Sequence, residues 1–448
     1  MSQFFAFFKA APHIEPIQDK QQVKVLYKAM RIRMMLGMII GYAAFYFVRK
    51  NFSMAMPSFL TELHYTKTDL GMILSLFSIL YGVGKFFNGM LADRANPRYF
   101  MAIGLLGAAV VNVFFGMSSS LIFFGLFWLL NAWFQSMGWP PCARMLTHWY
   151  SPRELGTMWG IWNSSHQIGG AGILVMAGYL ISTYGWRYAF YVPGVCVLLI
   201  VVFLIVTLRD TPQSLGLPRI EKYRGDMDET AHDEDDELAA LSTKEILFKH
   251  VLNNKLIWYL CFANFFVYIV RIGVLDWAPT FLVEAKKSSL AVAGVNVASF
   301  EIAGIIGAIL AGWLSDKVFK GRRGPANVLF MVALIFCVVY FWMIPPGYPL
   351  LDATALIAIG FFVYGPQMLV GVAAADFASK KASATATGLT GTFGYLGSTV
   401  CGVGTGAIVD KWGWNGGFIF FIMCAVIGTF LFALTWKQRS KTLESLHT

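Results

Sequence analysis

The chain has 448 residues, of which 57% are hydrophobic and 13% are charged, and its mean hydropathy is +0.60. A soluble domain carries about 25% charged residues, so this composition excludes a soluble globular protein and predicts a protein embedded in a lipid bilayer. The formal net charge of +10 is therefore interpreted loop by loop, and not as a sign of nucleic-acid binding.

Long apolar runs follow one another along the chain, and runs of about 20 residues are typical of membrane-spanning helices. Residues 1–30 lack an apolar core followed by a small-residue cleavage site, so we expect the first spanning helix to be retained. The sequence predicts an all-α membrane protein with twelve transmembrane helices, roughly at 33–56, 70–91, 99–118, 120–143, 156–181, 187–207, 256–282, 291–314, 325–345, 351–375, 383–409 and 414–436.

The connections between these runs differ in charge and length. Most of the 35 Lys and Arg residues fall in alternate connections, which predicts that the N- and C-termini are both cytoplasmic. Residues 208–255 are polar and acidic and contain proline, as is typical of a linker; a regulatory or partner-binding role is the alternative. We therefore expect an N-terminal six-helix bundle at 1–207, a cytoplasmic linker at 208–255 and a C-terminal six-helix bundle at 256–448.

Two pairs of short motifs recur at nearly the same distance. YFVRK at 46–50 and YIVRI at 268–272 are 222 residues apart, and GMLADR at 89–94 and GWLSDK at 312–317 are 223 residues apart. This agreement indicates a duplicated six-helix unit. The DR and SDKVFKGRRG turns resemble the short cytoplasmic loop of the major facilitator superfamily, whose fold has two pseudo-symmetric six-helix bundles and a central site reached alternately from each side.

Other motifs favour packing over chemistry. The glycines of GLTGTFGYLG at 388–397 recur every third residue, which predicts a surface where helices approach closely or bend. The six cysteines lie in or at the ends of apolar runs and are expected to be small buried residues. No motif for a metal, a nucleotide or a nucleophile is present, so we expect no enzyme activity, no cofactor and no metal site.

Arg49 and Arg271 lie deep inside apolar runs, where a charged side chain costs about 2.5–3.5 kcal/mol on insertion scales. Both are expected to line a polar cavity, facing each other across it because of the repeat. Asp276 and Glu301 are candidate neutralising acids, so a structural ion pair is the alternative for Arg271. Guanidinium groups match phosphate oxygens in bidentate fashion, so the pair favours a multiply charged anion.

Further polar and aromatic side chains fall in the same runs. Lys85 adds a third positive charge, and His166 adds a titratable donor beside Asn163, although a lone histidine or tyrosine in a membrane helix is often a packing residue. Hydroxyls of tyrosine can bind a phosphate or a polyol while the rings close the cavity. The aromatic candidates are Tyr42, Tyr46, Tyr81, Trp139, Trp162, Tyr268, Tyr364 and Tyr395.

Nine segments resemble the organophosphate:phosphate antiporters of bacteria, in order and over nearly the whole chain: GYAAFYFVRKNF, LYGVGKF, ADRANPRYF, WFQSMGWPPCAR, WNSSHQIGGAG, LRDTPQSLGLP, VYIVRIGVLDW, SDKVFKGRRG and FVYGPQMLVG. This family includes glycerol-3-phosphate and hexose-6-phosphate transporters and a hexose-phosphate receptor. The resemblance implies that Arg49 and Arg271 bind the phosphate and that Lys85 and His166 bind substrate. It also implies that Tyr42, Tyr46, Trp162, Asn163 and Tyr268 line the cavity.

The resemblance implies an antiporter of the bacterial inner membrane that exchanges a sugar phosphate, hexose 6-phosphate foremost, for inorganic phosphate. Segments such as ANPRYFMAIGL resemble the hexose-phosphate members, whereas Thr387 and Thr390 replace an Asp and a Lys of the hexose-phosphate transporter and resemble the glycerol-3-phosphate member. The alternatives are a glycerol-3-phosphate:phosphate antiporter, a receptor that senses hexose phosphate and signals to a membrane kinase, and a uniporter or channel. We expect a monomer in the lipid bilayer, with no nucleic-acid partner.

Overall fold

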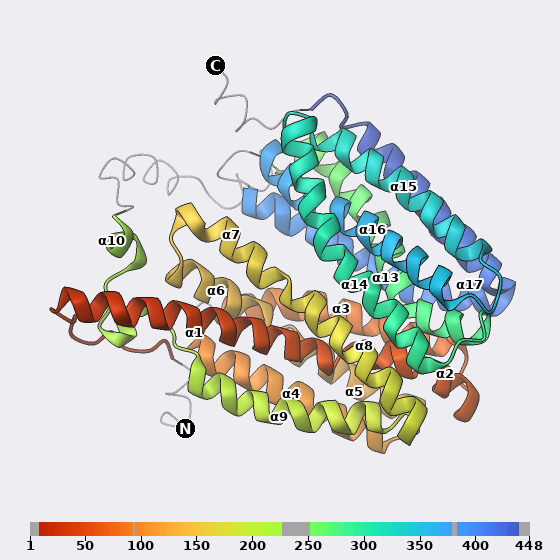
Figure 1. The fold of residues 1–448 in the computed structure, drawn as a ribbon, viewed down its shortest axis with the longest axis horizontal. Helices are drawn as coiled ribbons and strands as arrows, with labels where there is room; N and C mark the ends of the chain where they lie inside the picture. Colours follow the sequence, from red (N-terminus) through yellow and green to blue (C-terminus); the bar gives the residue numbers. More distant parts are fainter. Residues whose placement is uncertain (1–8, 93–94, 226–250, 379–382, 439–448) are drawn as a thin grey trace. The chain divides into compact units, whose positions relative to one another are not determined.

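The computed structural model describes residues 9–92, 95–225, 251–378 and 383–438, and every regular element in these ranges is a helix (Figure 1). The first half of the chain forms α1 (Lys20–Phe47), α2 (Asn51–Glu62), α3 (Lys67–Ala92), α4 (Pro97–Met117), α5 (Leu121–Gln135), α6 (Trp139–Trp149), α7 (Pro152–Asn163), α8 (Ser165–Tyr184), α9 (Tyr188–Thr207), the 3₁₀ turn η2 (Pro212–Leu215) and α10 (Ile220–Arg224). The second half forms α13 (Lys255–Glu284), α14 (Leu290–Trp313), the π turn η4 (Leu314–Val318), α15 (Arg323–Met343), α16 (Pro349–Phe377) and α17 (Ser383–Ala433). The all-α prediction is confirmed.

Eleven stretches of the described residues are long and apolar enough to cross a membrane. The difference from the twelve predicted helices lies in α17, which has 51 residues and contains Gly413 at φ 68° and ψ −174°. A residue other than glycine rarely adopts this positive φ, so Gly413 turns the chain between two spans. The predicted helices 383–409 and 414–436 are these two parts of α17.

Three predicted spans are each divided into two helices. The span predicted at 33–56 begins earlier, at Lys20, and breaks after Phe47. The span predicted at 120–143 breaks before α6, where Pro140 and Pro141 occupy the first turn; proline has no N–H to continue the α5 ladder. The span predicted at 156–181 breaks at Ser164, whose hydroxyl donates to the Ile161 carbonyl at 2.7 Å.

The chain folds into two compact units. Unit 1 consists of Met1–Asn51, Leu80–Ile173 and Tyr184–Ala231, and unit 2 consists of Phe52–Ile79, Leu174–Thr183 and His232–Thr448. Residues of the first predicted bundle therefore occur in both units. The division of the sequence at 207 and 255 into bundles and a linker remains a prediction, and the acidic part of the linker, 226–250, lies outside the described residues.

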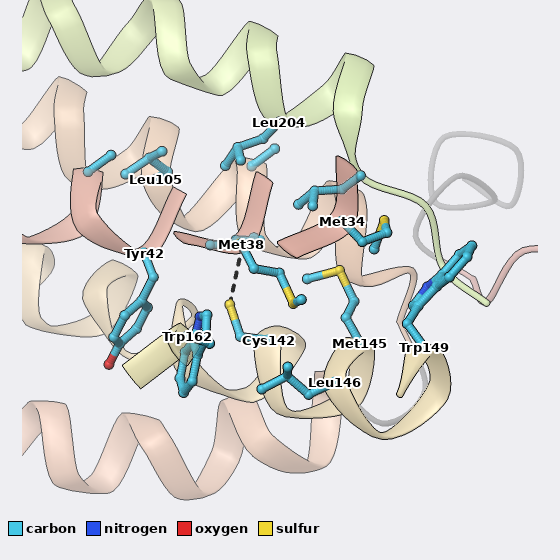
Figure 2. Close-up of a cluster of buried hydrophobic side chains, with 14 of the residues drawn as sticks. Met34, Met38, Tyr42, Leu105, Cys142, Met145, Leu146, Trp149, Trp162 and Leu204 are labelled. Carbon is cyan, nitrogen blue, oxygen red and sulfur yellow. Dashed lines mark hydrogen bonds between the residues drawn. The ribbon is translucent and has the colours of Figure 1, made fainter. Parts of the chain in front are cut away.

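The core of unit 1 is a cluster of methionine, leucine and aromatic side chains from α1, α4, α6, α7 and α9 (Figure 2). Met34, Met38, Cys142, Trp149 and Trp162 are all completely buried in it. Because lipid chains are as apolar as these side chains, close packing rather than burial from water holds such helices together. Tyr42 and Trp162 stand next to each other in this cluster, so the core directly supports residues that the sequence assigns to the site.

Unit 2 is held by close helix contacts and by partly buried ion pairs. A Cβ added at Gly307 of α14 would collide with the carbonyl of Phe361 in α16, so the missing side chain lets these helices touch. In the SDK motif, Arg323 donates to Ser315 and to Asp376, both at 3.0 Å, and to Asp316. The first copy of the motif includes Asp93 and Arg94, which lie outside the described residues.

Unit 2 also joins residues from the beginning and the end of the sequence. The carboxylate of Asp410 in α17 accepts hydrogen bonds from the backbone N–H groups of Lys67 (3.3 Å) and Thr68 (2.7 Å) and from the Thr68 hydroxyl (2.6 Å) at the start of α3. The Lys67 ammonium forms an ion pair with Glu284 of α13 at 3.1 Å. These contacts fix the first turn of α3 to α13 and α17.

The predicted glycine surface is only partly a packing surface. A Cβ at Gly394 would lie 2.9 Å from Tyr268, and one at Gly397 would collide with the Phe265 carbonyl, so these glycines let α17 approach α13. Gly388 and Gly391 have no atom within 4 Å of such a Cβ. Of the six cysteines, four are buried, Cys337 is half-buried and Cys196 is exposed, which corrects the prediction that all are buried.

Candidate functional site

Arg49 lies in the break between α1 and α2, and not inside a continuous helix as predicted. Two carbonyls freed by this break are satisfied by α5: Gln135 Nε2 donates to the Phe45 carbonyl and Asn131 Nδ2 to the Val48 carbonyl, each at 2.8 Å. Both amide side chains are buried. Non-helical backbone at membrane depth requires such partners, so α5 stabilises the break that positions Arg49.

The Arg49 guanidinium is surrounded by tyrosine rings. Its central carbon lies 4.7 Å from the ring centre of Tyr81 and 5.5 Å from that of Tyr46. One turn further along α3, the Lys85 ammonium lies 4.4 Å from the ring centre of Trp139. A cation over an aromatic face is attracted by the ring quadrupole, and this attraction grows as water is removed. Unit 1 thus holds two of the predicted cations against predicted aromatic residues.

The other predicted residues of unit 1 continue this cluster. Tyr42 packs against Trp162 with ring centres 4.9 Å apart and against Tyr46 at 5.8 Å, and Tyr46 packs against His166 at 5.7 Å. His166 Nδ1 contacts the backbone carbonyl of Asn163, which spans the break between α7 and α8. The structure therefore brings together the candidates at the breaks of two different spans.

Trp159 belongs to this cluster, although the sequence analysis did not select it. Its ring centre lies 5.7 Å from those of both Trp139 and Trp162, so it connects the Lys85 side of the cluster to the Tyr42 side. The signal was available, because Trp159 precedes Trp162 by three residues and so lies on the same helix face. We define the unit 1 cluster as Tyr42, Tyr46, Arg49, Tyr81, Lys85, Trp139, Trp159, Trp162, Asn163 and His166.

In unit 2, Arg271 is held in the interior of the bundle at 6% exposure. Its Nη2 donates to the Tyr364 hydroxyl at 2.8 Å, and its guanidinium carbon lies 4.5 Å from the Tyr364 ring centre and 5.8 Å from that of Tyr268. Tyr268 in turn packs edge-on against Tyr395, with ring centres 6.0 Å apart. These four residues, Tyr268, Arg271, Tyr364 and Tyr395, form the unit 2 cluster.

A hydrogen-bonded relay orients Arg271. The Tyr364 hydroxyl accepts from Arg271 and donates to the carboxylate of Glu301, which is fully buried. Glu301 was one of the two acids expected near Arg271; the other, Asp276, accepts a hydrogen bond from the Ser53 hydroxyl at 2.9 Å. Because a buried charge needs hydrogen-bonding partners, the relay stabilises Glu301 and fixes the direction of the guanidinium together.

The two clusters share one local design. In each unit an arginine packs against the tyrosine three residues before it and against a second tyrosine from another helix, Tyr81 in unit 1 and Tyr364 in unit 2. The tyrosine three residues before each arginine is part of the repeated motif, so the 222-residue repeat is present in the local structure as well as in the sequence. Rigid aromatic rings limit the conformations of each guanidinium, which reduces the entropy lost when it binds an anion.

Comparisons with known proteins agree with this architecture. Residues 38–401 match the Major Facilitator Superfamily. The chain is 48% identical to a probable hexose phosphate transport protein of Chlamydia pneumoniae, over 99% of this chain and all of that protein. It is 47% identical to the glycerol-3-phosphate transporter of Bacillus subtilis (96% and 97% covered) and 41% identical to the membrane sensor protein UhpC of Escherichia coli (95% and 96% covered).

Among solved structures, a bacterial homologue of the human lysosomal transporter Spinster, in an inward-facing and unoccupied conformation, superposes with a TM-score of 0.74. The two sequences are 16% identical, and the match covers 91% of this chain and 98% of that one, so it supports the fold alone. Together, the all-helical fold, the match over residues 38–401 and the full-length relatives place this chain in the major facilitator superfamily, within its organophosphate:phosphate antiporter family.

Proposed function

We propose that this protein is a secondary antiporter that exchanges a sugar phosphate for inorganic phosphate by alternating access, and that its preferred sugar phosphate is hexose 6-phosphate. The observation that carries the proposal is the pair of tyrosine-bounded arginines, one in each unit, at equivalent positions of the repeat. A phosphate monoester carries close to two negative charges near neutral pH and three strong acceptor oxygens. Two oriented guanidinium groups supply the donors and charge that such a group requires.

The residues around each arginine suit the other end of the substrate. Lys85 adds positive charge in unit 1, and the half-buried Tyr46, Tyr268 and Tyr395 can present hydroxyls to the oxygens of a sugar. We propose that the exposed amide of Asn163 contributes in the same way. Binding polar groups through hydroxyls and amides of fixed geometry gives selectivity for a hydroxylated substrate over a bare anion.

The identity of the organic group rests on finer observations. The relative in Chlamydia pneumoniae is named a probable hexose phosphate transport protein, which supports hexose 6-phosphate. Glycerol 3-phosphate is the second candidate, because Thr387 and Thr390 are neutral and bond to backbone carbonyls, of Gly371 at 3.4 Å and of Thr387 at 2.9 Å. The relative in Bacillus subtilis is similar to nearly the same degree.

A receptor for hexose phosphate is a third candidate, because UhpC of Escherichia coli is named a membrane sensor and aligns over 95% of this chain. In that case a membrane signalling kinase would be the partner. We propose instead a transporter that acts as a monomer in the bacterial inner membrane, with both termini cytoplasmic. In this orientation the contacts of Asp410 and Glu284 with the start of α3 lie toward the outer face.

The test is uptake by purified protein in phosphate-loaded lipid vesicles. Labelled glucose 6-phosphate and glycerol 3-phosphate are supplied separately, with phosphate-free vesicles as the control. If the protein is an antiporter, uptake should require phosphate inside the vesicles and should be faster for glucose 6-phosphate than for glycerol 3-phosphate. Equal uptake without internal phosphate would indicate a uniporter or channel, and saturable binding without uptake would indicate a receptor.

A further inference from the structure

Unit 1 contains a cavity of about 450 Å³ whose described lining includes no residue of the unit 1 cluster. It lies beside the N-terminal part of α1, and Leu36, its lining residue furthest along that helix, precedes Tyr42 of the cluster by six residues, about 9 Å at the helical rise. Four of its described lining residues are basic and none is acidic. The residues that matter here are Lys24, Lys28, Arg31, Ile32, Leu36 and Arg224.

One face of α1 changes from basic to apolar along this cavity. Lys24, Lys28, Ile32 and Leu36 follow at steps of four residues, so their side chains lie one above the other on the same face. Ile32 and Leu36 are 57% and 52% exposed. From Lys28 to Leu36 the helix rises about 12 Å. The surface is therefore amphiphilic along the direction in which α1 enters its apolar span.

Two guanidinium groups at the cavity, one from α1 and one from α10, meet at a single carboxylate of α7. Arg31 and Arg224 both donate to Glu154, the latter at 2.8 Å, so two guanidinium groups share one carboxylate. Arg31 also lies over the ring of Tyr150, with its guanidinium carbon 4.8 Å from the ring centre. These contacts hold both guanidinium groups at the cavity wall.

This wall is a fixed part of the fold. The short helix α10 lies beside the N-terminal part of α1 (Figure 1), where Tyr223 stacks on Tyr27 with ring centres 4.2 Å apart. The Tyr27 hydroxyl donates to the Pro218 carbonyl at 2.9 Å, and Ile220 is 1% exposed. The cavity is therefore formed by packed elements rather than by a loop alone.

We propose that this cavity binds an anionic phospholipid. The headgroup phosphate contacts Lys24, Lys28 and Arg224, and an acyl chain lies along Ile32 and Leu36. The charge of the basic wall matches a phosphodiester, and the apolar half of the α1 face matches a hydrocarbon chain. A soluble phosphate would use only the basic half, so the exposed isoleucine and leucine favour the lipid as occupant.

The test is lipid retention by the purified full-length chain, measured by native mass spectrometry after titration with phosphatidylglycerol or phosphatidylcholine. We expect selective retention of phosphatidylglycerol. In the Lys24→Gln/Lys28→Gln variant its affinity should fall roughly 30-fold, because each lysine near the surface contributes about 1 kcal/mol and about 1.4 kcal/mol corresponds to a tenfold change in affinity. The matched control is Lys317→Gln/Lys320→Gln, which removes the same charge from exposed positions of unit 2 and should leave retention unchanged. Equal retention of both lipids, or equal loss in both variants, would overturn the proposal.

Two further arms separate a lipid from a soluble anion. Leu36→Gln keeps every basic residue and should still weaken phosphatidylglycerol retention several-fold, because it removes contact with the acyl chain. Inorganic phosphate and the deacylated headgroup should not displace the lipid at equal concentration; displacement by either would mean that the site takes a soluble phosphate. If the double variant fails to fold, Lys24→Gln and Lys28→Gln are measured singly. Each should lose less phosphatidylglycerol retention than the double variant, and normal retention in both single variants would contradict the proposal.

Discussion

Replacing Arg271 by lysine tests the role of the unit 2 cluster most sharply. In the native chain Nη2 is bonded to Tyr364 at 2.8 Å, and the guanidinium packs against two tyrosine rings. Lysine keeps the positive charge but has no planar fork, so one group cannot bond to Tyr364 and also grip two phosphate oxygens in parallel. The variant should retain the electrostatic attraction and lose the oriented grip.

The size of the effect follows from the bonds lost. A hydrogen bond that involves a charged group contributes about 1.5–3 kcal/mol, and Arg271 is only 6% exposed, so solvent screens it little. Losing one such bond to the substrate corresponds to a half-saturating concentration that is roughly 10- to 150-fold higher. Any misorientation of the remaining ammonium adds to this, so uptake at low substrate concentration should nearly vanish.

The assay is uptake of labelled glucose 6-phosphate into phosphate-loaded vesicles, with thermal unfolding of the same preparations as the folding check. Arg187→Lys is the matched control, because Arg187 belongs to neither cluster: it donates to the carbonyls of Gly116 and Ser118 and to Ser119, and it packs on the Trp186 ring. A folded Arg271→Lys protein with near-normal uptake and unchanged half-saturation would refute the assignment of Arg271 to phosphate.

Three further outcomes are expected. His166→Ala should weaken binding and flatten its dependence on pH between about 5.5 and 7.5, where histidine usually titrates; an unchanged pH profile of the half-saturating concentration would assign His166 to packing. Tyr364→Phe removes the relay hydroxyl and should raise the half-saturating concentration about tenfold or more. The control Tyr340→Phe changes an exposed tyrosine of the same unit and should leave this concentration unchanged; the same half-saturating concentration in both variants would argue against the relay. Asp410→Ala removes the acceptor at the start of α3 and, like the loss of a helix cap, should lower the free energy of unfolding by about 0.5–2 kcal/mol. The melting temperature of this variant should therefore lie below that of the control Glu62→Gln, which changes an exposed residue; equal melting temperatures would mean that the contact contributes nothing to stability.

Much of the fold could be predicted because membrane-spanning helices are specified locally. Runs of apolar residues indicate each span, and the predicted 99–118 and 187–207 differ from α4 and α9 by two residues or fewer at either end. Tyr46 and Tyr268, both among the aromatic candidates, each precede an arginine by three residues, and each arginine packs on that ring. These features require no knowledge of tertiary structure.

The helix breaks depend on tertiary structure, which the local pattern does not contain. The break at Arg49 is satisfied by Asn131 and Gln135, more than 80 residues further along the chain, so nothing near 48–50 indicates it. The second tyrosine of each cluster, Tyr81 or Tyr364, is likewise brought in by another helix. The break before α6 was visible in Pro140 and Pro141, but an apolar run on both sides of it suggested continuity.

The segment after α9 shows a similar limit. Its polar composition predicted a linker, yet Leu217 and Ile220 are buried against unit 1 and Tyr223 stacks on Tyr27. Three apolar contacts within a polar stretch are too few to produce a periodic pattern. They are nevertheless enough to fix α10 beside α1 and so to form one wall of the proposed lipid site.

Obligate exchange is the central claim, and phosphate efflux tests it most directly. Reorientation of an empty carrier would move Arg49, Lys85 and Arg271 into drier surroundings without a bound anion, where the cost of burying positive charge rises. A bound dianion offsets that cost, so it favours the intermediate state that it binds most tightly. Vesicles loaded with labelled phosphate should therefore release it rapidly when glucose 6-phosphate or phosphate is present outside, and only slowly in its absence. Equal efflux rates in the two conditions would contradict the proposal.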